Sequence, residues 1–212
     1  DVGFDRSLVG AYGQDDRVCA YTELMAVLEL NNPEKTAVAI LTDKEETGSD
    51  GNTGLNSSYL KYFIEDLARL EGYEGRDVLR NSKCLSADVN AAFDPTWSSA
   101  FEKNNASFIN EGVVVTKFTG SHGKSGTSDA SAEYVSFVKN LLEENGVLWQ
   151  SGELGKVDGG GGGTVAVFMA ERDIDTLDAG VPVLSMHSPF ETVGKLDCYM
   201  TFKGVKAIYE AK

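Results

Sequence analysis

Acidic side chains and one histidine follow several apolar runs of the sequence, at positions where buried strands would end. The run 36–42 precedes Asp43, Glu45 and Glu46, the run 84–87 precedes Asp88, and the run 181–186 precedes His187. In open α/β sheets, ligands bind beyond the carboxyl ends of the strands, so we expect these side chains to converge. Grouped carboxylates are costly unless a cation neutralises them. The set therefore predicts a divalent metal site, and it suits Zn, Mn or Co better than a thiolate-type structural zinc site.

Each of these residues, taken singly, also has an ordinary structural explanation. An isolated aspartate after a strand is usually a turn residue or a helix cap. His187 at the end of an apolar run is more typical of a hydrogen-bonded core histidine, and Glu45 with Glu46 is typical of a solvated pair. The metal-site interpretation therefore depends on the combination and on the flanking residues.

The elements that would position these residues follow the pattern of an α/β domain, in which short apolar runs alternate with amphipathic stretches. Helices are expected at 16–30, 59–70, 130–145, 164–171 and 192–211, and strands at 36–42, 84–88, 113–115, 147–149 and 174–177. Glycine- and serine-rich segments at 48–54 and 120–129 are expected to be loops. Without an internal repeat or a linker, residues 1–212 are predicted to form one domain. Trp97 and Trp149 are expected in the core.

The composition excludes several classes of partner. The chain has 212 residues and a formal net charge of −14, which would repel nucleic acid and anionic lipid. No apolar run approaches the roughly 20 residues that a membrane-spanning helix needs. The cysteines number 3, which is too few for a disulfide framework. These features predict a cytoplasmic protein that binds neither nucleic acid nor membrane.

Four short motifs surround the candidate ligands, in the segments 13–17 (GQDDR), 43–49 (DKEETGS), 86–88 (SAD) and 184–189 (LSMHSP). In this order they resemble the metal-site motifs of the aspartyl aminopeptidase family, over essentially the whole chain. Segments 118–124, 149–150 and 153–160 resemble its bacterial branch most. The resemblance implies a cocatalytic dizinc exopeptidase with a three-layer αβα peptidase domain and a second domain used for assembly.

The resemblance also implies a role for each matching residue. Asp15 matches the aspartate that bridges both zinc ions, Glu46 and His187 match ligands of one ion, and Asp88 matches a ligand of the other. Glu45 matches the general base. A metal pair can polarise a peptide carbonyl and activate a water, and a neighbouring carboxylate can move that water's proton to the leaving amine.

Two departures from the family pattern limit this transfer. Family members carry a further histidine ligand before the assembly domain, whereas this chain has only 2 histidines and His122 lies in the wrong motif. The chain is therefore expected to be the C-terminal portion of the catalytic domain, incomplete at its N-terminal side, which would leave one metal short of a ligand. The family's histidines after Asp88 are also absent, so the resemblance implies no strict preference for acidic N-terminal residues.

Five consecutive glycines at 159–163 suggest a phosphate cradle, but the Lys-Ser/Thr ending of a P-loop is missing. The resemblance instead places this loop beside the active site and implies substrate contacts for Asp158, Gly162 and Thr164. A merely flexible loop is an equally open interpretation of the pattern. Lys117 is a candidate for contacting a substrate carboxylate, although a lysine at a strand end usually faces water. His122 and Lys124 are weak candidates for contacts to substrate or to a neighbouring subunit, and a solvated loop is the favoured interpretation of their segment.

The leading hypothesis is a zinc-dependent aminopeptidase that removes N-terminal residues from peptides, with Glu45 as its base. One alternative is an inactive or structural fragment of such an enzyme, because one histidine ligand is absent. Another is a related dizinc hydrolase that acts on a different amide. The resemblance further implies that the complete enzyme is a homo-oligomer, namely a dodecamer.

Overall fold

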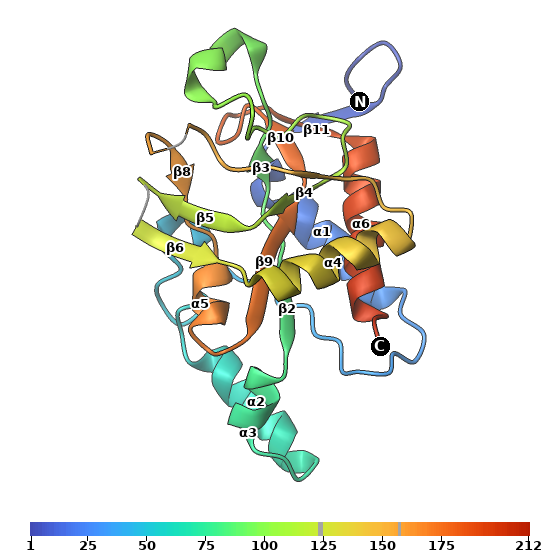
Figure 1. Cartoon of the computed structure of the whole chain (residues 1–212), viewed down its shortest axis with the longest axis vertical. Coiled ribbons are helices and arrows are strands. Elements are labelled where there is room, and N and C mark those ends of the chain that lie inside the picture. The colour runs from blue at the N-terminus through green and yellow to red at the C-terminus, as the bar shows by residue number, and fades with distance from the viewer. Residues whose placement is uncertain (123–124, 157) are drawn as a thin grey trace.

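The computed structural model describes residues 1–122, 125–156 and 158–212, so the prediction for Lys124 lies outside the described residues. It has the mixed α/β architecture that the sequence predicts (Figure 1). One sheet has the order β1 (Leu8–Ala11), β11 (Glu191–Gly194), β10 (Pro182–Leu184), β3 (Asn90–Ala91). A second has the order β2 (Lys83–Ser86), β9 (Asp175–Gly180), β4 (Val113–Thr116), β7 (Trp149–Ser151). A small third sheet has the order β6 (Ser125–Asp129), β5 (Phe118–Ser121), β8 (Gly161–Gly162).

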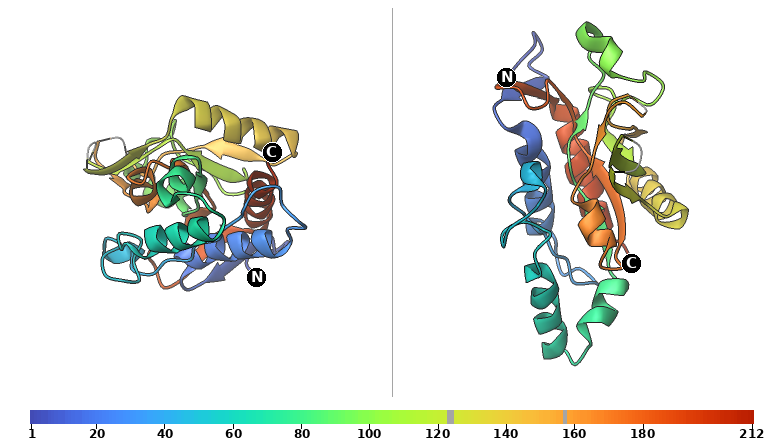
Figure 2. Two further views of the ribbon diagram at one scale, coloured as in Figure 1. Left: turned by 90° about the horizontal axis from the view of Figure 1, so that it is seen from below. Right: turned by 90° about the vertical axis from the view of Figure 1, so that its left-hand side faces the viewer.

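Helices cover the sheets from two sides (Figure 2). Helix α1 (Gln14–Leu28) packs on β10 and β11 through a buried cluster, and α4 (Ala132–Glu144) packs on β4 and β9 through another. Helix α6 (Lys195–Tyr209) contacts α1, α4, β4 and β11. Helices α2 (Tyr59–Leu70) and α3 (Gly75–Arg80) lie together at one end of the molecule, and α5 (Ala166–Ala170) precedes β9 (Figure 1). Two 3-10 turns, η1 (Glu45–Thr47) and η2 (Pro95–Ala100), lie in connecting segments.

The sequence of α4 shows why these elements form. The Ser131 side chain accepts a hydrogen bond from the backbone N–H of Tyr134 and caps the helix start. Tyr134, Val138 and Leu142 recur every four residues and are buried against the second sheet. Burial of each such side chain stabilises the fold by roughly 1.5–3 kcal/mol relative to exposure.

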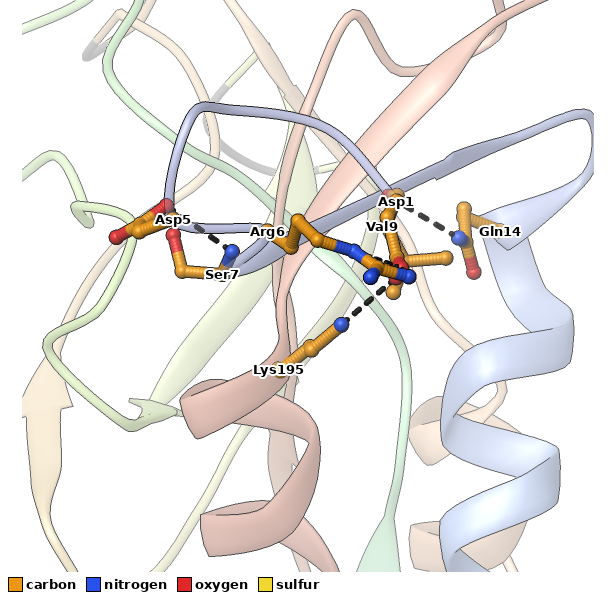
Figure 3. A network of polar contacts seen from close by, with 7 residues as sticks. All are labelled: Asp1, Asp5, Arg6, Ser7, Val9, Gln14 and Lys195. Carbon is orange, nitrogen blue, oxygen red and sulfur yellow. Dashed lines mark hydrogen bonds and ion pairs between the residues drawn. The ribbon is translucent and has the colours of Figure 1, made fainter.

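The first residues of the chain are tied to the first sheet and to α6 (Figure 3). The carboxylate of Asp1 accepts hydrogen bonds from the Arg6 guanidinium and from Lys195 Nζ at the start of α6. Gln14 Nε2 donates to the carbonyl of Val9 at 3.4 Å. These contacts fix β1 beside β11, and β1 leads directly into the segment that carries Asp15.

The predicted strand at 36–42 is not present. The segment is extended and its Ile40 packs against a cluster that includes Leu60 and Ile174, but no strand of the described residues pairs with it. Tyr209 Oη donates to the Val38 carbonyl at 3.3 Å. The apolar run reflects this partial burial, whereas a strand additionally needs a neighbour for its N–H and C=O groups.

Other boundaries also differ from the prediction. The expected loop at 120–129 contains the end of β5 and all of β6, which pair with each other. The expected helix at 192–211 begins only at Lys195, because residues 191–194 pair as β11. The expected helix at 164–171 is confined to α5. Trp97 is 70% exposed, so its placement in the core is wrong. Among the described residues, none of the helices has the length and apolarity needed to cross a membrane.

Candidate metal centre

His187 lies in the connection between β10 and β11, where it faces two carboxylates from distant parts of the chain. Its Nε2 atom is 3.0 Å from Asp15 Oδ2 and 3.3 Å from Glu46 Oε1. One donor atom from each of the three residues lies within 4.8 Å of the other two. The His187 backbone has a φ of 63°, in the left-handed region that few non-glycine residues adopt. A turn closed by the Ser188 N–H on the Ser185 carbonyl holds this conformation.

Asp15 lies at the start of α1, immediately after β1. Its side chain is only 10% exposed, whereas the side chains of Glu46 and His187 are 57% and 62% exposed. Burial, followed by repulsion from Glu46, raises the pKa of Asp15 from 3.8 to about 6. A bound cation would stabilise the ionised form of such a buried carboxylate and of the second carboxylate beside it.

Glu45 and Glu46 lie in η1, a short turn near the end of the extended segment described above. Lys44, which precedes the turn, has a φ of 69°, and its carbonyl accepts the Ser49 N–H at 2.7 Å. Glu45 is half-buried, and its pKa is raised by burial and by repulsion from Glu46 and Asp15. The two glutamates therefore differ in their surroundings. Glu46 is exposed and its carboxylate contacts His187, whereas Glu45 is half-buried.

Asp88 does not belong to the three-residue cluster, but the charges of nearby acidic residues affect its pKa. Burial raises its pKa well above the usual range, and repulsion from Asp16, Glu45 and Asp15 adds to this. It lines a cavity of about 20 Å³ together with Thr164 and other polar residues. Asp88 is itself half-buried, near enough to Asp15 and Glu45 for their charges to affect it.

The predicted substrate-binding residues divide between two neighbouring cavities. Gly162 and Thr164 line the small cavity beside Asp88. Asp158 and Gly162 line an adjacent cavity of about 80 Å³. Lys117 lines neither cavity, and its ammonium group forms an ion pair with Asp129 on β6.

Three further acidic residues lie in this region: Asp16, which the sequence predicts to be a structural partner of Asp15, and Asp178 and Glu191, which the motifs do not indicate. Asp16 accepts the N–H of Cys19, and its pKa is raised to about 7, chiefly by burial. Asp178 in β9 is 6% exposed and accepts a hydrogen bond from Ser86 Oγ at 2.7 Å. Glu191 at the start of β11 is 2% exposed. Their common signal in the sequence is an acidic residue beside or within an apolar element, which is also the pattern of a cap or an edge residue.

The arrangement is chemically suited to a divalent cation. Two carboxylate oxygens and one imidazole nitrogen from separate segments converge on one point, and such oxygen and nitrogen donors are ligands that Zn²⁺ accepts. The residues present therefore fit a catalytic-type zinc site, which keeps positions open for water or substrate. The fold and the donor set are those that an α/β metalloprotein would need.

Comparison with known proteins assigns the chain to a family. The model of the family described as aminopeptidase I zinc metalloprotease (M18) matches residues 1–209. A probable M18 family aminopeptidase 1 from Clostridium acetobutylicum is 48% identical over 211 residues, which cover 98% of this chain and 45% of that protein. The chain therefore belongs to the M18 family, the aspartyl aminopeptidase family whose motifs it carries.

Solved structures agree with this assignment. A crystal structure of an M18 family aminopeptidase from Thermotoga maritima matches with a TM-score of 0.95 and 46% identity, over 99% of this chain and 47% of that one. A structure described as the mApe1 dodecamer of Saccharomyces cerevisiae has the same fold, with a TM-score of 0.80 at 23% identity, over 99% and 47% of the two chains. The chain thus spans about half the length of the relatives it matches.

Proposed function

We propose that residues 1–212 form the C-terminal portion of the catalytic domain of a zinc aminopeptidase that removes N-terminal residues from peptides. The observation that carries this proposal is the convergence of Asp15, Glu46 and His187 on one point, in a chain of the M18 family. In this assignment these three residues would hold one ion. Asp15 and Asp88 would contribute to holding a second ion, together with a ligand from outside this chain. Zn²⁺ is the cation assigned to both positions, and Mn²⁺ or Co²⁺ would suit the same donors.

The metal pair, when bound, would supply Lewis-acid polarisation of the scissile carbonyl. Glu45 is assigned as the general base, because it precedes Glu46 in η1 and its carboxylate is half-buried. The pKa of Glu45 is raised by burial and by its acidic neighbours, which brings it closer to the range where a carboxylate accepts and returns a proton efficiently. In this role it takes a proton from the attacking water and delivers it to the departing amine.

The substrate would approach along the cavities beside Asp88. Asp158, Gly162 and Thr164 line these cavities and are the residues assigned to contact the peptide. Lys117 is also proposed to contact a substrate carboxylate, although it lines neither cavity and its pairing with Asp129 reduces its capacity to attract an acidic side chain. This pairing and the absence of histidines just after Asp88 favour peptides with a range of N-terminal residues.

The complete protein is proposed to be a cytoplasmic homo-oligomer that binds neither nucleic acid nor membrane. The dodecamer named for the Saccharomyces cerevisiae relative supports the oligomer. Free thiols at Cys19, Cys84 and Cys198 support a reducing compartment. The charge of −14 supports the exclusion of nucleic acid.

The test uses the full-length gene product that contains this chain, loaded with Zn²⁺ and assayed on aminoacyl-anilides. Glu45→Gln is expected to lower turnover by at least about 100-fold, because a general base contributes roughly 10²–10⁴-fold. Zinc content, measured by atomic absorption, is expected to stay at the wild-type level. Glu144→Gln, at an exposed position of α4, is the matched control and is expected to keep full activity.

Three outcomes would contradict the proposal. Unchanged turnover of Glu45→Gln would remove the base assignment. Hydrolysis of N-acetylated substrates in preference to free amines would favour a related amide hydrolase. A full-length protein that binds zinc but cleaves none of the anilides would favour a structural role for the metal.

A further inference from the structure

Glu191 connects the two chain segments that carry Asp15 and His187. Its Oε2 atom accepts a hydrogen bond from the backbone N–H of Asp15 at 3.0 Å, and its Oε1 atom accepts one from the backbone N–H of His187 at 2.6 Å. The first bond spans 176 residues of sequence. Because β11 pairs with β1 and Ala11 lies opposite Glu191, the Glu191 carboxylate can reach the connection between β1 and α1, where it binds the Asp15 amide.

The burial of this carboxylate needs an explanation. Glu191 is 2% exposed, and among the described residues no lysine, arginine or histidine forms an ion pair with it. An ionised carboxylate in such a place is costly, and two backbone N–H groups compensate only part of the cost. Asp15 adds a second negative charge nearby, and Glu191 contributes to the repulsion that Asp15 experiences. A cation held by Asp15 and His187 would stabilise both carboxylates.

The two bonds also explain how the ligand side is held in shape. His187 and Ser185 both have positive φ values, of 63° and 60°, which are unfavourable for residues with a side chain. The short bond to Glu191 fixes the His187 amide in this conformation, while the other oxygen fixes the start of the Asp15 segment. One rigid group on a strand therefore sets the separation of two side chains that come from different elements.

We propose that Glu191 is a positioning residue of the metal centre, which clamps the backbones of Asp15 and His187 so that their side chains meet at one cation. The proposal rests on the metal site of the proposed function. A carboxylate is required because both neighbours are N–H donors, and it offers an acceptor on each oxygen. Glutamine has a single acceptor oxygen, so its NH₂ group would face one of the two N–H donors.

The main experiment compares Glu191→Gln with the wild-type full-length protein by competitive titration of Zn²⁺ against a chromophoric chelator. Loss of a partner that orients a metal ligand typically lowers metal affinity by roughly 10–100-fold, and we expect a loss in this range. The visible absorption bands of the Co²⁺-loaded protein are expected to shift, because the geometry of the donors changes. Titrations are run where circular dichroism shows each variant to be folded, so that unfolding cannot produce the loss.

Asp197 offers a matched control. It is fully buried, and like Glu191 it accepts two backbone N–H bonds, from Asn110 and Gly112 at 2.8 Å each, but neither amide belongs to a candidate ligand. Asp197→Asn is expected to lower the melting temperature while the Zn²⁺ affinity and the Co²⁺ spectrum stay at wild-type values. An equal loss of affinity in both variants would show a general effect of destabilisation and would overturn the proposal.

A second measurement separates this proposal from the proposed function. In the metal-free protein, Glu191→Gln is expected to accelerate hydrogen exchange of the Asp15 and His187 amides by about 10-fold or more, because each loses a charge-assisted bond. Unchanged exchange would overturn the clamp even if zinc binds. A wild-type protein that binds no zinc would contradict the proposed function and also the positioning role, whatever the exchange shows. If Glu191→Gln does not fold, Glu191→Asp, whose shorter side chain cannot reach both amides, decides by the same titration: wild-type affinity overturns the proposal.

Discussion

The two sides of the candidate metal centre are supported in different ways. On one side, Asp15 and His187 have their backbone amides bound to the buried carboxylate of Glu191, on a strand paired on both of its edges. On the other side, Glu45 and Glu46 lie in a short turn near an extended segment that pairs with no strand of the described residues. The hydrogen bonds that close this turn lie within residues 43–56.

This difference shows how a metal site can hold some ligands in fixed positions and keep others accessible to solvent. The Asp15 backbone is held by Glu191 and its carboxylate is almost covered, while Glu46 approaches from the solvent side with most of its side chain exposed. A cation would be met by a preformed pair of ligands on the first side and would itself restrain the second. The clamped side is thus expected to determine affinity, and the turn is expected to respond to binding.

The largest expected effect comes from removing one ligand on each side. Asp15→Asn is expected to lower the Zn²⁺ affinity by more than about 100-fold, because loss of a supporting partner alone costs roughly 10–100-fold and Asp15 is assigned as a direct ligand. Glu46→Gln is expected to cost about 10-fold less than Asp15→Asn, since water can replace an exposed ligand. Competitive titration of the full-length variants measures both. Equal losses would mean that the two sides hold the cation alike.

A smaller effect is expected in the pH dependence of the metal-free protein. Burial raises the pKa of Asp178 from 3.8 to about 6, so between these values the folded state keeps a proton that the unfolded state has released. The free energy of unfolding therefore falls as the pH rises through this window, by roughly 3 kcal/mol at most. Asp178→Asn keeps an acceptor for Ser86 and is expected to remove the contribution of Asp178 to this fall, while Asp15 and Asp197, whose pKa values are also raised, keep theirs.

Asp43, next to the exposed turn, changes the free energy of unfolding with pH in the opposite direction. A hydrogen bond from Lys44 lowers the pKa of Asp43, so its stabilising contribution is complete above 3.8 and is lost only as the pH falls through the lowered value. Asp43→Asn is therefore expected to lower stability slightly and equally at pH 4.5 and pH 7, where the contribution of Asp43 is complete. Urea unfolding at pH 4.5 and pH 7 in the presence of a chelator measures both variants. If Asp178→Asn follows the wild-type pH profile, burial of Asp178 does not act as argued.

The motifs made the neighbourhood of the site predictable from the sequence, because Asp15, Glu46 and His187 each follow or begin an element with a recognisable pattern. Their donor atoms do lie together in the structure, within 4.8 Å. The role of each as a ligand stays a prediction. The role of Glu191 could not be predicted, because acidic residues are common at the start of a strand. Only the pairing of β11 with β1 shows what its carboxylate contacts.

The elements were predictable where local pattern determines structure and unpredictable where pairing does. Helix α4 follows from its cap and its four-residue apolar repeat. Strands β5 and β6 have a glycine- and serine-rich sequence typical of a loop. They nevertheless pair as antiparallel strands, with Phe118 opposite Asp129. The run 36–42 has the opposite character, since its apolar residues indicate burial and cannot indicate whether a partner strand is present.

The smallest expected effect concerns the response of the two sides to the cation. Saturating Zn²⁺ is expected to slow hydrogen exchange of residues 43–54 by about 10-fold, because binding through Glu46 disfavours local opening of a turn held by few bonds. Residues 187–194 are expected to change by less than about twofold, since their amides are already protected by Glu191 and by strand pairing. Mass spectrometry of peptides from the full-length protein, with residues 134–142 of α4 as the internal reference, measures both. Slowing confined to 187–194 would reverse the comparison and show that the turn is the preformed side.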